Sequence, residues 1–191
     1  MNWSLPTKIK INEKEYPIRN KCDYRVVLDV ISALNDEELE MKHRIECALC
    51  IFYGKSNENV KEVLETLNDI ETATIEMLKI INLGEKNEEE QPKAKLMDWE
   101  HDFPQLAPPI SRILGYSVRN EENYTHWYDF VGAYMEIGEC AFSTVVSIRK
   151  KRLKGAKLEK WEQEFYKENK KTIDLPQNLT EEEKEWLDSD W

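Results

Sequence analysis

Three side chains in one short segment have the chemistry and spacing of metal ligands. His43 stands four residues before Cys47, and Cys50 follows three residues later in a Cys-x-x-Cys motif. Residues three and four apart share one face of a helix, so all three could reach a single Zn²⁺ ion. A structural zinc site has four such ligands, however, and Cys22 and Cys140 stand alone in the sequence. We therefore interpret the three residues as small side chains facing a neighbouring helix, and we predict no metal and no cofactor.

A second cluster has the residue types of general acid–base catalysis. Asp98, Glu100, His101 and Asp102 fall close together in the sequence, and carboxylates beside an imidazole can move protons or hold a divalent cation. Acidic residues are also favoured at the start of a helix, where they interact with the helix dipole. The sequence has no P-loop, HExxH, GxSxG or GxGxxG motif beside the cluster. The balance favours a binding protein over an enzyme.

The elements that carry these residues are predicted to be mainly helical. Alternation in Lys8–Ile11 and a second short strand at Tyr16–Ile18 predict a β-hairpin at the N-terminus. From Asp23 onward, apolar residues recur at three- and four-residue steps, which is the period of an amphipathic helix. The predicted helices are one capped by Asp23, one over 36–54, one capped by Ser56 or Asn57 and ended by Gly84, one capped by Asp102 with a kink or restart at Pro108, one over 122–139, one from about Ser143 and one over 158–173.

Composition divides the chain into four parts. Residues 1–84 hold the hairpin and a helical subdomain, and residues 85–95, which contain no aliphatic side chain larger than alanine, are predicted to be a linker. Residues 96–175 form a second helical region. Residues 176–191 form a tail in which a capping box at Thr180 predicts a short helix. The predicted fold is mainly α: a multi-helix bundle with a small N-terminal β-hairpin.

Charge is distributed unevenly along the chain. The formal net charge of the 191 residues is −11, which argues against a DNA-binding field over the whole protein. Residues 149–160 are the exception, with seven basic residues and one acidic residue. Such a run can bind phosphates, so nucleic-acid binding through 149–160 is the alternative function; the acidic remainder makes an acidic protein surface our preferred partner. No apolar run reaches the length of a membrane span.

The sequence also predicts which residues near the basic run lie in the structural core and which contact a partner. The residues expected in the structural core share one helical face, and they are Trp127, Phe130, Val131 and Tyr134. Gly132 and Gly138 in the same segment each cost about 1 kcal/mol relative to alanine in a helix, which predicts the close approach of another helix. The residues expected to contact a partner are Arg149, Lys150, Arg152, Lys157, Trp161 and Phe165.

The stretch from about Leu96 to Leu175 also carries a pattern of conspicuous residues in a set order. In sequence, these are Asp98 and Asp102, Leu114-Gly115-Tyr116, His126-Trp127, Phe130, Met135–Gly138, Cys140, Phe142, Ile148-Arg149, Trp161, Phe165-Tyr166 and Asn169-Lys170. Their order and spacing resemble the bacteriophage "gene product fifteen" family of tailed phages. Tyr128 stands where many relatives carry a second tryptophan, and residues 1–84 lie outside the resemblance.

The resemblance implies a helical, non-enzymatic protein encoded among phage tail genes. Members are regarded as tail assembly chaperones, which by analogy bind the tape measure protein and prevent its aggregation until tail tube subunits replace them. The resemblance further implies a homo-oligomer that acts in the host bacterial cytoplasm during siphovirus virion morphogenesis. The expected partners are therefore the tape measure protein, further copies of the chain and the tail tube protein, with no membrane.

Overall fold

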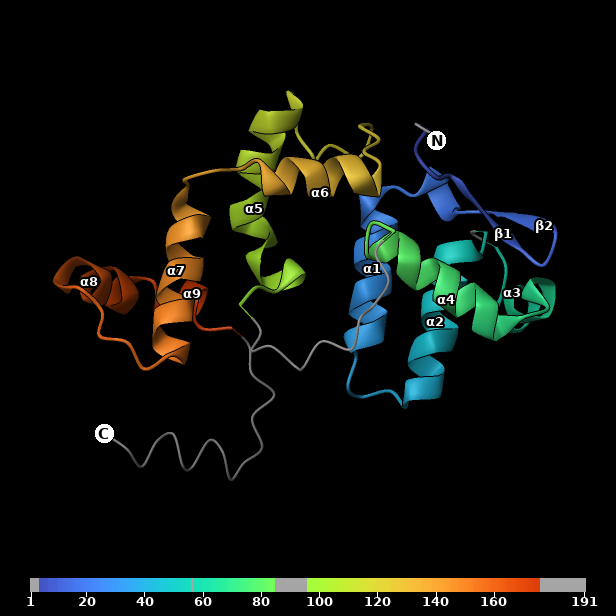
Figure 1. Cartoon of the computed structure of the whole chain (residues 1–191), viewed down its shortest axis with the longest axis horizontal. Helices are drawn as coiled ribbons and strands as arrows, with labels where there is room; N and C mark the ends of the chain where they lie inside the picture. The colour runs from blue at the N-terminus through green and yellow to red at the C-terminus, as the bar shows by residue number, and fades with distance from the viewer. Residues whose placement is uncertain (1–3, 56, 85–95, 176–191) are drawn as a thin grey trace. The chain divides into compact units, whose positions relative to one another are not determined.

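The computed structural model describes residues 4–55, 57–84 and 96–175 (Figure 1). Its elements are β1 (Lys8–Ile11), β2 (Lys14–Pro17), the 3-10 turn η1 (Arg19–Lys21), α1 (Tyr24–Asn35), α2 (Met41–Tyr53), α3 (Val60–Leu67), α4 (Ile70–Ile81), α5 (Trp99–Leu114), α6 (Trp127–Met135), α7 (Ala141–Leu153), α8 (Lys160–Glu168) and α9 (Lys170–Ile173). The predicted fold class, mainly α with a small N-terminal hairpin, is confirmed. The predicted linker, the predicted tail helix and Ser56 lie outside the described residues.

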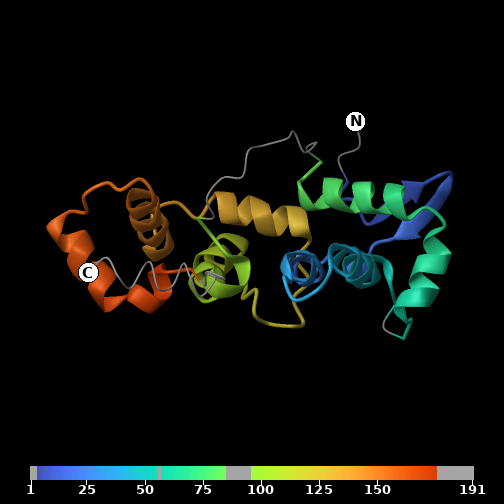
Figure 2. The ribbon, with the colours of Figure 1, turned by 90° about the horizontal axis from the view of Figure 1, so that it is seen from below.

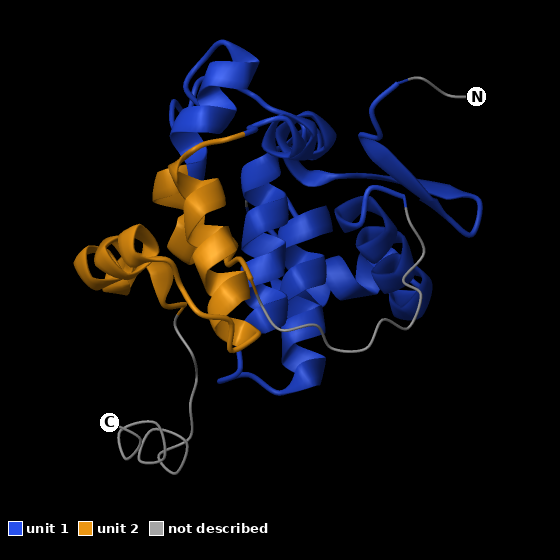
Figure 3. Ribbon diagram, turned by 60° about the vertical axis from the view of Figure 1, so that its left-hand side comes forward, with its two compact units in different colours: residues 1–93, 106–138 blue, residues 94–105, 139–191 orange. Residues whose placement is uncertain are grey.

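The described residues form two compact units, coloured separately in Figure 3. The first, unit 1, contains the described residues up to Gly84 together with 106–138. The second, unit 2, contains 96–105 and 139–175. Residues 106–138 therefore pack with the N-terminal half of the chain, although the composition of the sequence placed them with the C-terminal region.

The hairpin of unit 1 follows from alternation and a tight turn. β1 and β2 pair in antiparallel fashion, and Ile9 and Ile11 are buried while Lys8 and Lys10 are exposed. Asn12 and Glu13 have φ values of 45° and 70°. Two positive φ values are typical of the two-residue turn whose twist matches the twist of paired strands.

Helices α1 and α2 lie side by side in both Figure 1 and Figure 2, and their residues are in contact. The predicted cap of α1 is confirmed, because a carboxylate oxygen of Asp23 accepts a hydrogen bond from the Arg25 backbone N–H at 3.0 Å. α2 begins at Met41 and not at Asp36, because residues 37–39 form a turn before it. It ends at Gly54 as predicted, where an added Cβ would lie 2.4 Å from the carbonyl oxygen of Cys50.

The single long helix predicted up to Gly84 is wrong, because the chain breaks it into α3 and α4. Asn68 has a φ of 60°, which a helix interior does not accept. Asp69 then caps α4 by accepting a hydrogen bond from the Thr72 backbone N–H at 2.9 Å. Asn12 in the hairpin turn donates to the same carboxylate at 2.7 Å. A seven-residue repeat in the sequence, formed by Val60, Leu67, Thr74 and Ile81, continues across this break. Polar side chains stabilise the break.

Helix α5 is continuous, which excludes a restart at Pro108, one of the two alternatives predicted there, and corrects the predicted cap at Asp102. The capping interaction is one turn earlier, where Asp98 accepts a hydrogen bond from the His101 backbone N–H at 2.8 Å. Pro104, Pro108 and Pro109 all lie inside the helix. Each lacks an N–H, so one carbonyl on the preceding turn receives no helical hydrogen bond from it.

Helix α6 is shorter than the predicted 122–139, and His126 supplies its cap. The imidazole Nδ1 of His126 accepts a hydrogen bond from the Tyr128 backbone N–H at 3.0 Å. At the other end, Gly138 lies beyond the helix with a φ of 62°, a conformation that favours glycine. The predicted close approach of a helix at Gly132 is wrong, because an added Cβ there would meet no atom within 4 Å.

One thiol in unit 1 is expected to be inert while the protein is folded. Cys22 is fully buried, and burial is the largest cause that raises its pKa to about 12. Since the thiolate is the reactive form, we expect Cys22 to resist iodoacetamide at pH 8 in the folded protein and to react fully in urea. Mass spectrometry of both samples measures this, with half-buried Cys140 as the internal control. Rapid modification of folded Cys22 would contradict the structure.

Candidate docking surface

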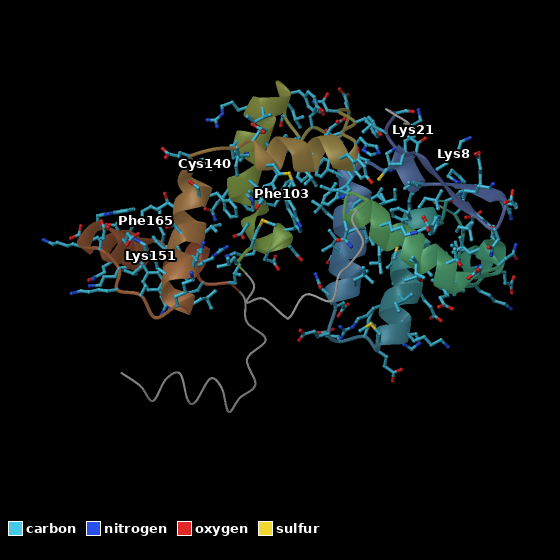
Figure 4. The ribbon with its side chains drawn as sticks, in the orientation of Figure 1. Lys8, Lys21, Phe103, Cys140, Lys151 and Phe165 are labelled. Carbon is cyan, nitrogen blue, oxygen red and sulfur yellow. The ribbon has the colours of Figure 1, made fainter. Side chains whose placement is uncertain are left out.

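Unit 2 is organised around a small apolar cluster between α7 and α9. Val145, Ile148 and Ile173 are buried there. Leu158, Phe165 and Tyr166 pack against them. Phe165, which was predicted to contact a partner, is therefore half-buried against the interior of its own unit. It is labelled on α8 in Figure 4.

Arg149 is buried in this unit, with 5% of its surface exposed. Its guanidinium forms a bidentate ion pair with the Asp102 carboxylate, with N–O distances of 2.7 and 2.8 Å. The other contacts of the guanidinium are with carbonyl oxygens: Leu96 at 3.1 Å, Thr172 at 2.9 Å and Ile173 at 2.6 Å. Together these contacts use all five N–H donors of an arginine. We therefore assign Arg149 to the interior and not to the docking surface predicted from the sequence.

The acidic cluster considered for catalysis is likewise engaged in packing. Asp102 binds Arg149 and accepts from the Asp98 backbone N–H at 3.0 Å. His101 Nε2 lies 3.1 Å from the carbonyl oxygen of Thr172, so this nitrogen donates. Glu100 is exposed. Within the described residues, no three His, Cys, Asp or Glu side chains are arranged to hold a metal, which includes the His43, Cys47 and Cys50 set.

Two ion pairs connect the C-terminal end of α7 to α8 and to the residue that follows α9. Lys151 Nζ lies 2.6 Å from a carboxylate oxygen of buried Glu162 on α8. This hydrogen bond is the largest cause that lowers the pKa of Glu162 below its ordinary 4.5, and a hydrogen bond from the Glu159 backbone N–H is the second. The ionised carboxylate therefore stabilises the folded unit fully at neutral pH, and this contribution is lost as the pH falls through the lowered pKa. Arg152 pairs with Asp174 just after α9 and lies over the Tyr166 ring.

The remaining basic residues of 149–160 are exposed, and so are the large apolar side chains of Leu153 and Trp161. We call this set the docking surface: Lys150, Leu153, Lys154, Lys157, Lys160 and Trp161. Leu153 and Trp161 are each 53% exposed, and the Trp161 indole N–H donates to Glu159 at 2.8 Å. None of the four lysines forms an ion pair with any residue that the structure describes. An apolar and basic surface of this kind suits a partner with acidic and apolar residues on one face.

The docking surface overlaps the predicted one only in part. Lys150, Lys157 and Trp161 are exposed as expected, and Arg152 lies at the edge because its charge is already paired. The sequence reasoning missed Leu153, Lys154 and Lys160. A signal for Leu153 and Lys154 was present, because they lie three and four residues after Lys150 and so share its helical face.

The aromatic residues of α6 lie inside unit 1. Trp127, Phe130 and Val131 are buried, and Tyr134 is half-buried. The Trp127 indole N–H donates to the carbonyl oxygen of Ile81 at 3.0 Å. The Phe130 ring stacks on Tyr24, with 4.1 Å between their centroids. Fully buried His126 adds a contact from Nε2 to the carbonyl oxygen of Pro6 at 3.0 Å.

Comparison with protein families identifies this mainly helical chain as a bacteriophage protein. The family model that matches is described as Bacteriophage Gp15 protein and spans residues 1–175, and the chain belongs to that family. The match includes residues 1–84, which the resemblance read from the sequence left out. No curated protein and no solved structure matches the chain. Among the described helices, none is long and apolar enough to cross a membrane.

Proposed function

We propose that this phage protein is a tail assembly chaperone that binds the tape measure protein and prevents its aggregation, without catalysis, in the host cytoplasm. The observation that carries the proposal is the docking surface on a member of this phage family. Leu153 and Trp161 supply apolar contact area, and the four lysines of the same surface form no ion pair with any described residue. Further copies of the chain and the tail tube protein are the other expected partners.

The proposed mode of binding is the docking of an amphipathic helix. A long helical client presents repeated apolar stripes that aggregate when they are left uncovered. The apolar side chains of the docking surface would cover such a stripe, and its lysines would pair with acidic residues beside the stripe. Exposed ion pairs are individually weak, so the complex would remain reversible and could yield to tail tube subunits.

The test is coexpression of the chain with the tape measure protein of the same phage. We expect the tape measure protein to become soluble and to co-purify with the chain. A docking variant, Lys154→Glu with Lys157→Glu and Trp161→Ala, should reduce the co-purified amount about tenfold, because an exposed tryptophan anchor is lost and two charges are reversed. The control, Lys42→Glu with Lys61→Glu, reverses two lysines whose side chains are 79% and 83% exposed in unit 1. It should have no effect.

Two outcomes of this experiment would count against the proposal. If the unaltered chain neither solubilises nor retains the tape measure protein, the chaperone function is wrong. If the docking variant retains as much client as the control, the function stands but the surface is misassigned. Melting curves of both variants establish that they are folded.

Nucleic-acid binding is the second candidate. The observation that favours it is the four lysines of the docking surface, which pair with no acidic residue that the structure describes. Binding to phosphates releases counterions, so the affinity for a short duplex should fall steeply as salt is added. Negligible binding at low salt would remove this candidate. The net charge of −11 already opposes it.

A further inference from the structure

We infer that residues 176–191 of the same chain occupy the docking surface and compete there with other partners. This deepens the proposed function, because it assigns a regulator to the same surface, but it depends on the chemistry of that surface and not on the identity of the client. Three features support this assignment: the place where the described chain leaves unit 2, the residues that follow, and the distance that they can span.

The described chain ends beside the docking surface. Asp174 accepts a hydrogen bond from the Tyr166 hydroxyl at 3.0 Å and pairs with Arg152. Arg152 directly precedes Leu153 and Lys154 in α7. The ion pair therefore holds the start of the following segment close in sequence to Leu153 and Lys154 of the docking surface.

The residues that follow are complementary to that surface in charge and in polarity. Residues 176–191 contain six acidic residues and one lysine. The acidic residues are Glu181, Glu182, Glu183, Glu185, Asp188 and Asp190. The apolar residues among them are Leu179, Trp186, Leu187 and Trp191. An acidic segment interleaved with large apolar side chains is the partner chemistry that exposed lysines around Leu153 and Trp161 would select.

The covalent link makes this segment a strong competitor. Thr180 lies six positions after Asp174, and a chain of that length spans up to roughly 20 Å. A short covalent link of this length gives an effective concentration on the order of millimolar. A contact with an intrinsic dissociation constant of about 0.1 mM would then be mostly formed, and it would weaken the binding of a free competitor about tenfold.

The first test locates the segment by cross-linking. The full-length chain is mixed with an equal amount of the same chain labelled with ¹⁵N, and a carbodiimide then joins lysines to carboxylates in direct contact. We expect links from Lys154, Lys157 or Lys160 to the glutamates at 181–185, each within one isotope class. The absence of these links would overturn the inference. Links that mix the two isotope classes would overturn it as well, because they would place a second copy on the surface.

The second test measures the competition and needs no tape measure protein. The probe is a fluorescent peptide with the sequence of residues 177–191. The tail variant replaces Glu181, Glu182, Glu183 and Glu185 with glutamine in the full-length chain, and its matched control replaces Glu71, Glu121, Glu122 and Glu139, which are exposed in the structure. Fluorescence anisotropy should show about tenfold tighter peptide binding to the tail variant than to the unaltered chain or the control.

Equal affinities for all three proteins, or no binding to any of them, would overturn the inference. Failure here and failure of the proposed function are distinguishable. A chaperone without this competition would still solubilise the tape measure protein in the coexpression experiment. A chain with this competition but a different client would pass the cross-linking and peptide tests and fail the coexpression test.

Discussion

Replacing Arg149 with methionine is expected to destabilise unit 2 by about 3–5 kcal/mol, the typical cost of removing one partner of a buried ion pair. The substitution leaves the Asp102 carboxylate, which is fully buried, without its guanidinium. It also removes donors from the carbonyl oxygens of Thr172 and Ile173. Because two units need not unfold together, urea melts alone are ambiguous. Amide hydrogen exchange in α7 is the appropriate measurement.

The control for this substitution is Arg152→Met. Arg152 is 43% exposed, so its loss should cost about 1 kcal/mol or less. A double variant, Arg149→Met with Asp102→Leu, should recover much of the lost stability, because no charge is then left unpaired. If Arg149→Met and Arg152→Met were equally mild, the buried network described for unit 2 would be wrong.

The second large effect is expected in unit 1, where Phe130→Ala should cost about 3–5 kcal/mol. Phe130 is fully buried, lies stacked on Tyr24 and has its ring centroid 6.0 Å from that of Trp127. Its removal leaves a cavity between α1 and α6 in addition to the lost burial of the ring. Thermal melts and the loss of exchange protection in α1 measure the effect.

Two milder substitutions make the Phe130 prediction specific. Phe130→Leu keeps most of the apolar volume and should cost clearly less than Phe130→Ala. Tyr134→Ala removes an aromatic ring of the same helix that is only half-buried, so it should also cost less. A Phe130→Ala protein that melts like the Tyr134→Ala protein would contradict the packing of α6 against α1.

Local patterns in the sequence predicted the elements that depend on local physics. The alternation of Ile9 and Ile11 predicted the hairpin, and Asp23 predicted the start of α1, because strand period and capping involve neighbouring residues. The break at Asn68 was not predictable from periodicity, since the apolar heptad continues through it. It depends on a positive φ and on a hydrogen bond from Asn12, a residue that is distant in sequence.

The candidate site shows the same division between local and distant causes. The basic run could be recognised in the sequence, and Lys150, Lys157 and Trp161 are exposed as that run predicts. The burial of Arg149 could not be predicted, because its partner Asp102 lies 47 residues earlier and only the tertiary fold brings the two together. Basic residues in a run look alike in sequence, and their distant partners decide which of them can reach another molecule.

The backbone bridge between residues near Cys22 and those near Trp127 also sets an order of events during synthesis. The Tyr24 N–H donates to the Thr125 carbonyl and the Trp127 N–H to the Cys22 carbonyl, both at 2.9 Å. A ribosome that has made α1 must add roughly 100 more residues, which takes about 5–20 s at typical bacterial rates, before α6 can cover it. Until then the face of α1 that carries Tyr24 stays uncovered in the nascent chain. Unit 1 therefore completes its folding late, after most of the chain has left the ribosome.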